Sequence, residues 1–196
     1  MTLRTECELA APSRREVMTA LLAGVAVGSF VFADTAAAAP TRPDEMPDWP
    51  LQDAFGKPAR WRTQVLADHV VIVNFVYTTC GSLCPVVSAL MSDLQMRLRS
   101  RTPVAFVSLS LDPLTDTPQS LRRFAAPFSP GPRWWWLTGE VRTMHRLLDA
   151  LDAGPGPDLA SHGPQWLIGR AGRGAWRRLV DLPPLAQFQS AVDALQ

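Results

Sequence analysis

Two cysteines, Cys80 and Cys84, stand four residues apart and directly follow an apolar run that ends in Thr78 and Thr79. At the start of a helix, residues i and i+4 share one face, at a spacing that a disulfide tolerates. The unpaired N–H groups of a helix N-terminus also favour thiolate over thiol. The pair is therefore suited to forming a disulfide, to binding a metal ion, or to alternating between the two. A structural disulfide or two inert buried thiols would need no further chemistry.

A metal ion other than two-coordinate Cu(I) needs more than two sulfur ligands, and His162 is the best candidate for a third donor. It lies in a Gly/Pro-rich loop just before a predicted strand, a place that favours exposure over burial. Two thiolates and one imidazole form a soft donor set that suits copper, with zinc as the other choice. An exposed loop histidine without a ligand role is the alternative. We expect His69 and His145 to cap or cover the core.

The composition limits the classes of protein to which the chain can belong. Its 196 residues are 47% hydrophobic and 19% charged, which is typical of one globular domain with or without a leader. The formal net charge of +1 gives no excess of cations for nucleic acid, so no nucleic-acid partner is expected. Three cysteines are too few for a disulfide framework, and Cys7 falls in the leader.

Residues 1–39 have the pattern of an export signal. Arg14 and Arg15 form a basic front of the twin-arginine type, an apolar run covers residues 17–33, and small residues at 36–38 resemble a cleavage site. An uncleaved N-terminal membrane anchor is the alternative. Either reading predicts a domain in the periplasm or on the outer face of the cytoplasmic membrane. Residues 40–50 carry four prolines and predict an extended linker, which leaves residues 51–196 as the domain.

The elements around the cysteines predict a parallel β-α-β unit. Residues 70–77 form an apolar run without alternation, which is typical of a strand buried on both faces. A helical stripe over 83–99 and a second apolar run over 104–109 follow, so the two strands should pair in parallel through a right-handed crossover. Cys80 and Cys84 then lie at the junction of the first strand and its helix.

The rest of the chain completes an α/β pattern. It predicts a strand and turn at 53–58, a helix that Thr117 caps, a core strand at 134–137, helices at 140–151 and 185–195, and a hairpin of 165–168 with 177–180. Asp112 and Asp116 are assigned to turn and cap positions. The prediction is a thioredoxin-like fold, with a mixed central sheet of four or five strands flanked by helices and a C-terminal β-hairpin.

Four segments of the chain resemble the Sco/SenC family, and the resemblance covers about residues 50–195. A C-x-x-x-C-P element together with a D-P-x-x-D-T element is fairly specific for this family, although either alone would be weak. The segments are 78–85 (TTCGSLCP), 110–118 (SLDPLTDTP), 137–139 (LTG) and 161–162 (SH).

The resemblance implies an exported or membrane-tethered copper protein with a thioredoxin-like fold. In the family, two cysteines and a distal histidine bind Cu(I) or Cu(II), and by position these would be Cys80, Cys84 and His162. The family serves assembly of the copper A centre of cytochrome c oxidase by delivering copper, by reducing the cysteines of its target, or by both. The implied partners are the copper A subunit or another cuproprotein, and a copper donor.

Three features depart from the family pattern. Gly81, Ser82 and Leu83 include no acidic residue, Ser161 stands where an aspartate is usual, and the segment between Gly139 and His162 is short. The alternative function is a thiol–disulfide oxidoreductase that uses Cys80 and Cys84 without metal. The C-x-x-x-C spacing is wider than the usual redox C-x-x-C, which counts against it. A peroxidase-like relative is disfavoured, because no basic partner is evident beside Cys80.

Overall fold

The computed structural model describes residues 43–67, 69–98, 103–154, 156, 158–173 and 176–196. The predicted export signal and the first residues of the predicted linker lie outside this part of the chain. Among the helices of the described residues, none has both the length and the apolar character needed to cross a membrane.

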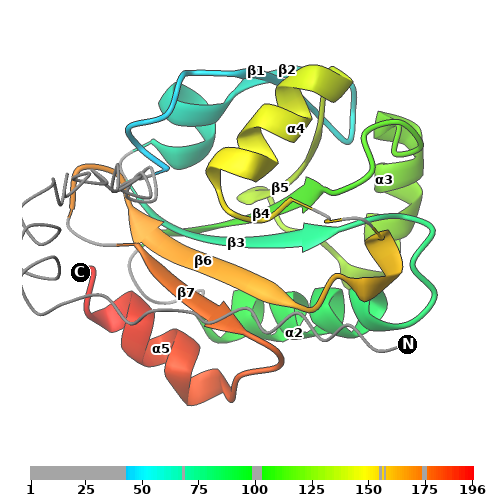
Figure 1. Ribbon diagram of the computed structural model, residues 1–196. Coiled ribbons are helices and arrows are strands. Elements are labelled where there is room, and N and C mark those ends of the chain that lie inside the picture. The colour runs from blue at the N-terminus through cyan, green and yellow to red at the C-terminus, as the bar shows by residue number, and fades with distance from the viewer. Residues whose placement is uncertain (1–42, 68, 99–102, 155, 157, 174–175) are drawn as a thin grey trace, which may run out of the picture. The chain divides into compact units, whose positions relative to one another are not determined.

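A mixed β-sheet forms the centre of the domain (Figure 1). In the described residues it has seven strands in the order β2-β1-β5-β4-β3-β6-β7. The central strands β3, β4 and β5 are parallel, and the outer pairings are antiparallel. The strands are β1 (Pro50–Asp53), β2 (Pro58–Arg60), β3 (Val70–Val76), β4 (Val104–Ser110), β5 (Trp134–Thr138), β6 (Gln165–Arg170) and β7 (Arg177–Val180).

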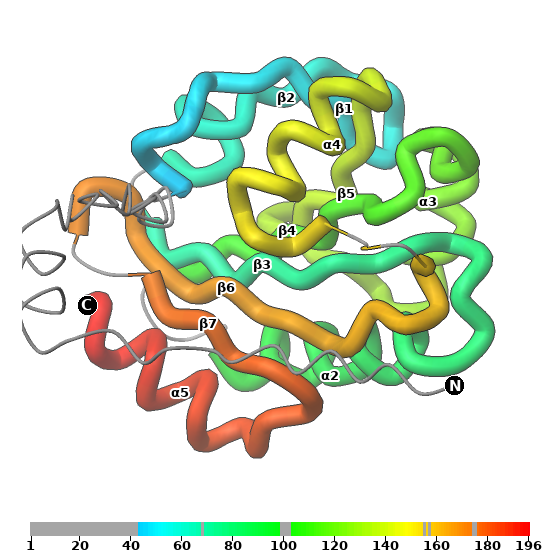
Figure 2. The backbone as a smooth tube through the Cα atoms, viewed as in Figure 1, coloured from blue at the N-terminus to red at the C-terminus, as the bar shows by residue number. Residues whose placement is uncertain are grey.

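Helices cover both faces of the sheet, as Figure 2 shows for α2 and α5 on one side and α4 on the other. One core layer packs α2, α3 and α5 against residues such as Val70 and Ile72 of β3. The other layer packs α4 against Val71 and Val73 of the same strand. The helices are α2 (Leu83–Arg97), α3 (Pro118–Ala125), α4 (Val141–Ala150) and α5 (Leu185–Asp193).

The parallel unit is the best predicted part of the fold. Every residue of β3 and of β4 is buried, and the two strands pair in register from Val70 opposite Val104 to Val76 opposite Ser110. The C-terminal hairpin of β6 and β7 is also confirmed, as is the N-cap of α3, where Thr117 Oγ1 accepts the N–H of Ser120 at 3.1 Å. The sheet is wider than predicted, because the β1–β2 hairpin, turning at Gly56 with φ +77°, adds two strands beyond β5, with β2 at the edge.

The domain starts before the predicted boundary at residue 51, because residues 43–50 pack against it. Met46 is 2% exposed and belongs to the core. The indole of Trp61 donates to the carbonyl of Pro43 at 3.1 Å, and that of Trp176 donates to the carboxylate of Asp44 at 2.8 Å. Prolines exclude a helix in this segment, but they do not exclude packing against residues distant in the chain.

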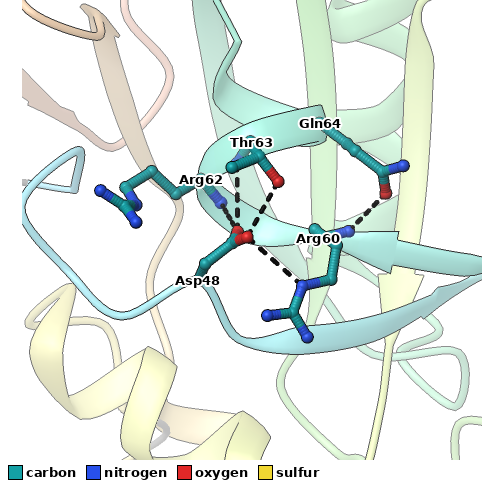
Figure 3. Close-up of polar contacts among 5 residues, drawn as sticks. All are labelled: Asp48, Arg60, Arg62, Thr63 and Gln64. Atoms are coloured by element: carbon teal, nitrogen blue, oxygen red, sulfur yellow. Dashed lines mark hydrogen bonds and ion pairs between the residues drawn. The ribbon is translucent and has the colours of Figure 1, made fainter.

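Asp48 ties this segment to a single π-helical turn, Trp61–Leu66 (Figure 3). Its Oδ1 accepts the N–H groups of Arg62 at 2.8 Å and Thr63 at 3.1 Å. Its Oδ2 accepts the hydroxyl of Thr63 at 2.8 Å and Nε of Arg60 at 3.3 Å. Burial raises the pKa of Asp48, but these hydrogen bonds outweigh it and lower the pKa from 3.8 to about 2.

Replacing Asp48 with alanine should lower the free energy of unfolding by about 1–2 kcal/mol, because the first N–H groups of the turn lose their acceptor. The depressed pKa means that the contribution is fully present above pH 3.8 and is lost as pH falls toward 2. Urea unfolding followed by tryptophan fluorescence, repeated across this range, measures both effects. Asp93→Ala is the control, since its pair with Arg97 is exposed and should contribute less than about 1 kcal/mol. Equal effects of the two substitutions would contradict this account.

Candidate metal centre

Cys80 and Cys84 lie where the chain passes from β3 into α2. Cys84 is in the first turn of α2, and Cys80 precedes the helix in the loop that follows the strand. Both are free thiols and each is 7% exposed. The backbone N–H of Cys84 donates to Sγ of Cys80 at 3.3 Å. The helix N-terminus therefore faces the Cys80 sulfur, as its place in the sequence predicts.

The surroundings of Cys80 stabilise its thiolate. Burial raises the pKa of this thiol, but hydrogen bonds from the backbone N–H groups of Cys84 and Ser82 outweigh burial. Hydrogen bonds with the Cys84 thiol and with Tyr77 add to the effect, and together they lower the pKa from 9.0 to about 6. At neutral pH Cys80 is therefore mainly the thiolate, which is the nucleophilic and metal-binding form.

Cys84 has the opposite protonation. Burial raises its pKa and is only partly opposed by a backbone hydrogen bond with Tyr77. The hydrogen bond with Cys80 and the negative charges of Cys80 and Asp116 add to the effect of burial, and the pKa rises from 9.0 to about 12. The Cys84 thiol therefore keeps its proton and forms a hydrogen bond with the Cys80 thiolate. A metal ion that used both sulfurs would have to displace the proton of Cys84.

Tyr77 is part of this site, although the sequence did not single it out. Its hydrogen bond with Cys80 raises the pKa of the phenol, and burial and nearby negative charges raise it further, to about 12. The hydroxyl therefore stays protonated and can donate to the sulfur. Tyr77 is the one tyrosine of the chain and ends the apolar run before the cysteines. These two features of the sequence could have identified Tyr77 as a residue of the site.

Asp116 does more than occupy a turn or cap position, because its side chain connects two segments of the chain. Its carboxylate is buried, with the residue 2% exposed. Oδ1 accepts the N–H of Thr78 at 3.0 Å and its hydroxyl at 2.6 Å, and Oδ2 accepts the hydroxyl of Ser110 at 2.7 Å. Asp116 thus joins the loop after β4 to the segment two residues before Cys80. Asp112 does fit the predicted turn, since its carboxylate and carbonyl accept the N–H of Thr115.

His162 follows a short 3-10 turn, Leu159–Ser161, and precedes β6. It is half-buried rather than exposed, and its ring meets that of Phe75 edge-on, with centroids 6.3 Å apart. Burial lowers the pKa of the imidazole, which favours the neutral form. Its Nε2 is buried and has no hydrogen-bond partner among the described residues. A buried, unpaired ring nitrogen is costly unless a ligand or water meets it.

Cys80, Cys84 and His162 line one small pocket of about 30 Å³, together with Tyr77 and Phe75. Such a volume holds one water-sized guest. As the side chains stand, no three His, Cys, Asp or Glu groups of the described residues are close enough together to hold a metal ion. The fold therefore brings the three predicted residues to one pocket without placing all three donors around a common point.

The other two histidines lie outside this pocket. His145 is exposed on α4, so it does not cover the core as expected. His69 is partly buried at the head of β3, in agreement with its predicted position beside the core.

A mixed sheet with helices on both faces, and with a dithiol at its first parallel strand-to-helix junction, defines a thioredoxin-like protein. Residues 37–154 match the family model described as SCO1/SenC, and the chain belongs to that family. The matched segment contains both cysteines and ends before His162.

Individual relatives agree with this assignment. The SCO1 protein homolog of Bacillus subtilis (strain 168) is 37% identical over 76 residues, which cover 38% of this chain and 39% of that protein. The chain thus matches about two fifths of the length of this relative. BsSco, from the Sco family of cytochrome c oxidase assembly proteins, has a TM-score of 0.62 at 25% identity over 74% of this chain and 90% of its own. Copper-bound yeast Sco1 has a TM-score of 0.62 at 16% identity, over 80% of this chain and 97% of its own.

The two cysteines should react differently with an alkylating agent. Iodoacetamide should label Cys80 with a midpoint near pH 6 and leave Cys84 largely unlabelled at neutral pH, because only the thiolate reacts. Mass spectrometry of the labelled peptides reads each residue separately. Tyr77→Phe removes one hydrogen bond to the Cys80 thiolate and should move the midpoint upward. Faster labelling of Cys84 than of Cys80 would refute the assignment.

Asp116→Ala should lower the free energy of unfolding by about 2–4 kcal/mol, because it leaves the donors of Thr78 and Ser110 unpaired. Asp116→Asn keeps an acceptor for Thr78 and should cost less. Asp112→Ala, in the same loop but with an exposed hydrogen bond, is the matched control. Chemical unfolding gives the energies, and Cys80 labelling shows whether the loop before the cysteines has moved. A loss from Asp112→Ala as large as that from Asp116→Ala would count against the special role of Asp116.

Proposed function

We propose that this protein binds one copper ion through Cys80, Cys84 and His162 and transfers it to another cuproprotein. The observation that supports this most directly is the unpaired, buried Nε2 of His162 in the same pocket as the two cysteines. A third donor must have a ring nitrogen that is not engaged elsewhere and can ligate a metal ion. A neutral imidazole, as the lowered pKa favours, has the free electron pair that ligation uses.

The donor set fits copper better than other metals. Two thiolate sulfurs and an imidazole nitrogen are soft ligands, which suit Cu(I), and the stability order places Cu(II) above Zn(II) at such a site. Binding would take the proton from Cys84 and draw His162 toward the sulfurs, since the three donors do not surround one point beforehand. Gly81, Ser82, Leu83 and Ser161 add no negative charge beside the ligands, which should weaken Cu(II) more than Cu(I).

The receiving partner we propose is the copper A subunit of cytochrome c oxidase or another cuproprotein, with a separate copper donor. Membership of the SCO1/SenC family supports this, as does the description of BsSco within a family of cytochrome c oxidase assembly proteins. We place the protein in the periplasm or on the outer face of the cytoplasmic membrane. The export pattern of residues 1–39 supports that location, and an uncleaved leader would add membrane association.

A second function, thiol–disulfide exchange by Cys80 and Cys84 alone, has its own support. The pair combines a thiolate of low pKa with a buried thiol of high pKa, an asymmetry typical of dithiol redox centres. A disulfide switch has been identified in BsSco. In this role Cys80 and Cys84 would reduce a disulfide of the target to two thiols and would themselves be oxidised to a disulfide, and His162 would not take part.

His162→Ala should weaken copper binding by roughly tenfold or more, because even the indirect partners of metal ligands contribute tenfold or more to affinity. Titration of the reduced full-length protein with Cu(I) against a competing chelator, and with Cu(II) by visible absorption, measures the change. His145→Ala, an exposed histidine outside the pocket, is the matched control and should bind as the parent protein does.

The same variants separate the two functions. If His162→Ala leaves both the affinity and the copper spectrum unchanged, the histidine is not a ligand. If the protein takes up no copper but exchanges disulfides at the same potential in both variants, the dithiol function replaces the copper function.

A further inference from the structure

A second and much larger pocket, about 650 Å³, lies beside the outer edge of β5. The residues that line it come from the β1–β2 hairpin, the end of α3 and the first residues of β5. We call it the β5-edge groove. It shares no residue with the pocket of the cysteines, and its volume is typical of binding sites.

The groove runs along a strand edge that no described strand occupies. β5 pairs with β4 from Trp134 to Leu137, whereas it pairs with β1 only at Leu137 and Thr138. After Asp53 the chain leaves β5 and turns through residues 54–57 into β2. The outer edge of Trp134–Trp136 therefore faces the groove. The N–H of Trp134 already donates to the carbonyl of Gly131 at 3.0 Å, so this edge is open only in part. A partly open strand edge is still a template for an added strand.

The groove is lined mainly by apolar residues, although Trp134 and Trp136 are themselves only 6% and 3% exposed. Trp134 and Trp136 stack with ring centroids 5.1 Å apart, and three prolines line the same space. At the mouth, Phe55 is 69% exposed, and the guanidinium of Arg122 lies 6.0 Å from the centre of its ring. A large aromatic side chain left exposed beside an apolar hollow marks an interaction site more often than a bare surface.

The charge around the groove is positive. Lys57, the single lysine of the chain, and Arg122 are both exposed and line it. Among the described lining residues Asp53 is the one carboxylate, and its Oδ1 already accepts the N–H groups of Phe55 and Lys57 at 2.8 Å each. The groove therefore offers two cations to an acidic ligand, and its one anion is engaged within the turn.

We propose that the β5-edge groove binds an extended, acidic peptide segment of a partner protein. The segment adds a strand to the outer edge of Trp134–Trp136, its apolar side chains lie against the tryptophans, and a carboxylate lies between Lys57 and Arg122. Main-chain hydrogen bonds along the strand supply affinity in this mode, and pockets and charges supply specificity. The open part of the strand edge, at Trp136, favours a peptide over a small aromatic anion, which would leave that part unpaired.

The first test uses the full-length protein and a blocked nonapeptide of sequence GSVEVEVSG, with binding followed by calorimetry. Two matched peptides carry either lysine in place of glutamate or N-methyl groups on the valines, which block strand addition. We expect binding of the first peptide and a loss of about tenfold or more in affinity for each of the others. Equal binding of the N-methylated peptide overturns the proposal, and so does binding of 8-anilinonaphthalene-1-sulfonate without any peptide binding.

The second test locates the site. Arg122→Glu should weaken the acidic peptide by about tenfold, while Arg123→Glu, the exposed neighbour that does not line the groove, should leave it unchanged. A carbodiimide should join a glutamate of the bound peptide to Lys57, which the single lysine makes easy to identify. Binding that persists in Arg122→Glu, or a crosslink absent from Lys57, refutes the location. Cys80→Ser should not alter peptide binding, so this result is independent of the copper site.

Discussion

Parallel pairing of β3 with β4 is the constraint on which the site depends. Because the two strands run in the same direction and in register from Val70 opposite Val104, their carboxyl ends reach the same edge of the sheet. The segment after β3 carries the cysteines, and the segment after β4 carries Asp116. Asp116 can accept the hydrogen bonds of Thr78 because these two segments lie at the same edge of the sheet. An antiparallel pairing would have put the loops at opposite ends of the sheet.

The local geometry at the end of β3 creates the difference between the two thiols. Cys80 precedes α2 and receives an N–H of the first turn, whereas Cys84 lies within that turn and faces the core. A pair separated by three residues can therefore hold one thiolate and one thiol, since hydrogen bonds outweigh burial at Cys80 whereas burial outweighs them at Cys84. The charge of Asp116 reinforces the difference, since it disfavours a second thiolate at Cys84. The residue that anchors the loop thus also contributes to the protonation of the pair.

The sequence was sufficient for features that depend on neighbouring residues. The unbroken apolar runs identified β3 and β4, Thr117 before Pro118 identified the start of α3, and the helical stripe over 83–99 identified the helix that starts beside the cysteines. It was insufficient where a side chain meets a distant segment. Asp116 resembles a turn residue until β3 and β4 are paired, and residues 43–50 resemble a linker until Trp61 and Trp176 are placed beside them. Burial of His162 likewise depends on Phe75, which lies far away in the chain.

The same distinction separates the two chemistries of the site. The sulfurs are carried by one strand end and one helix turn, and Asp116 from the loop after β4 anchors the segment before them. The imidazole comes from the loop before β6, and β6 lies on the other side of β3 from β4. The pairing of β6 with β3 is what brings this loop to the pocket. The proposed thiol exchange therefore depends on β3, α2 and the loop after β4, whereas the proposed three-donor copper site also depends on the loop before β6. A change in the loop before β6 should alter the proposed metal binding while leaving the thiols intact, so the two proposed functions depend on different parts of the fold.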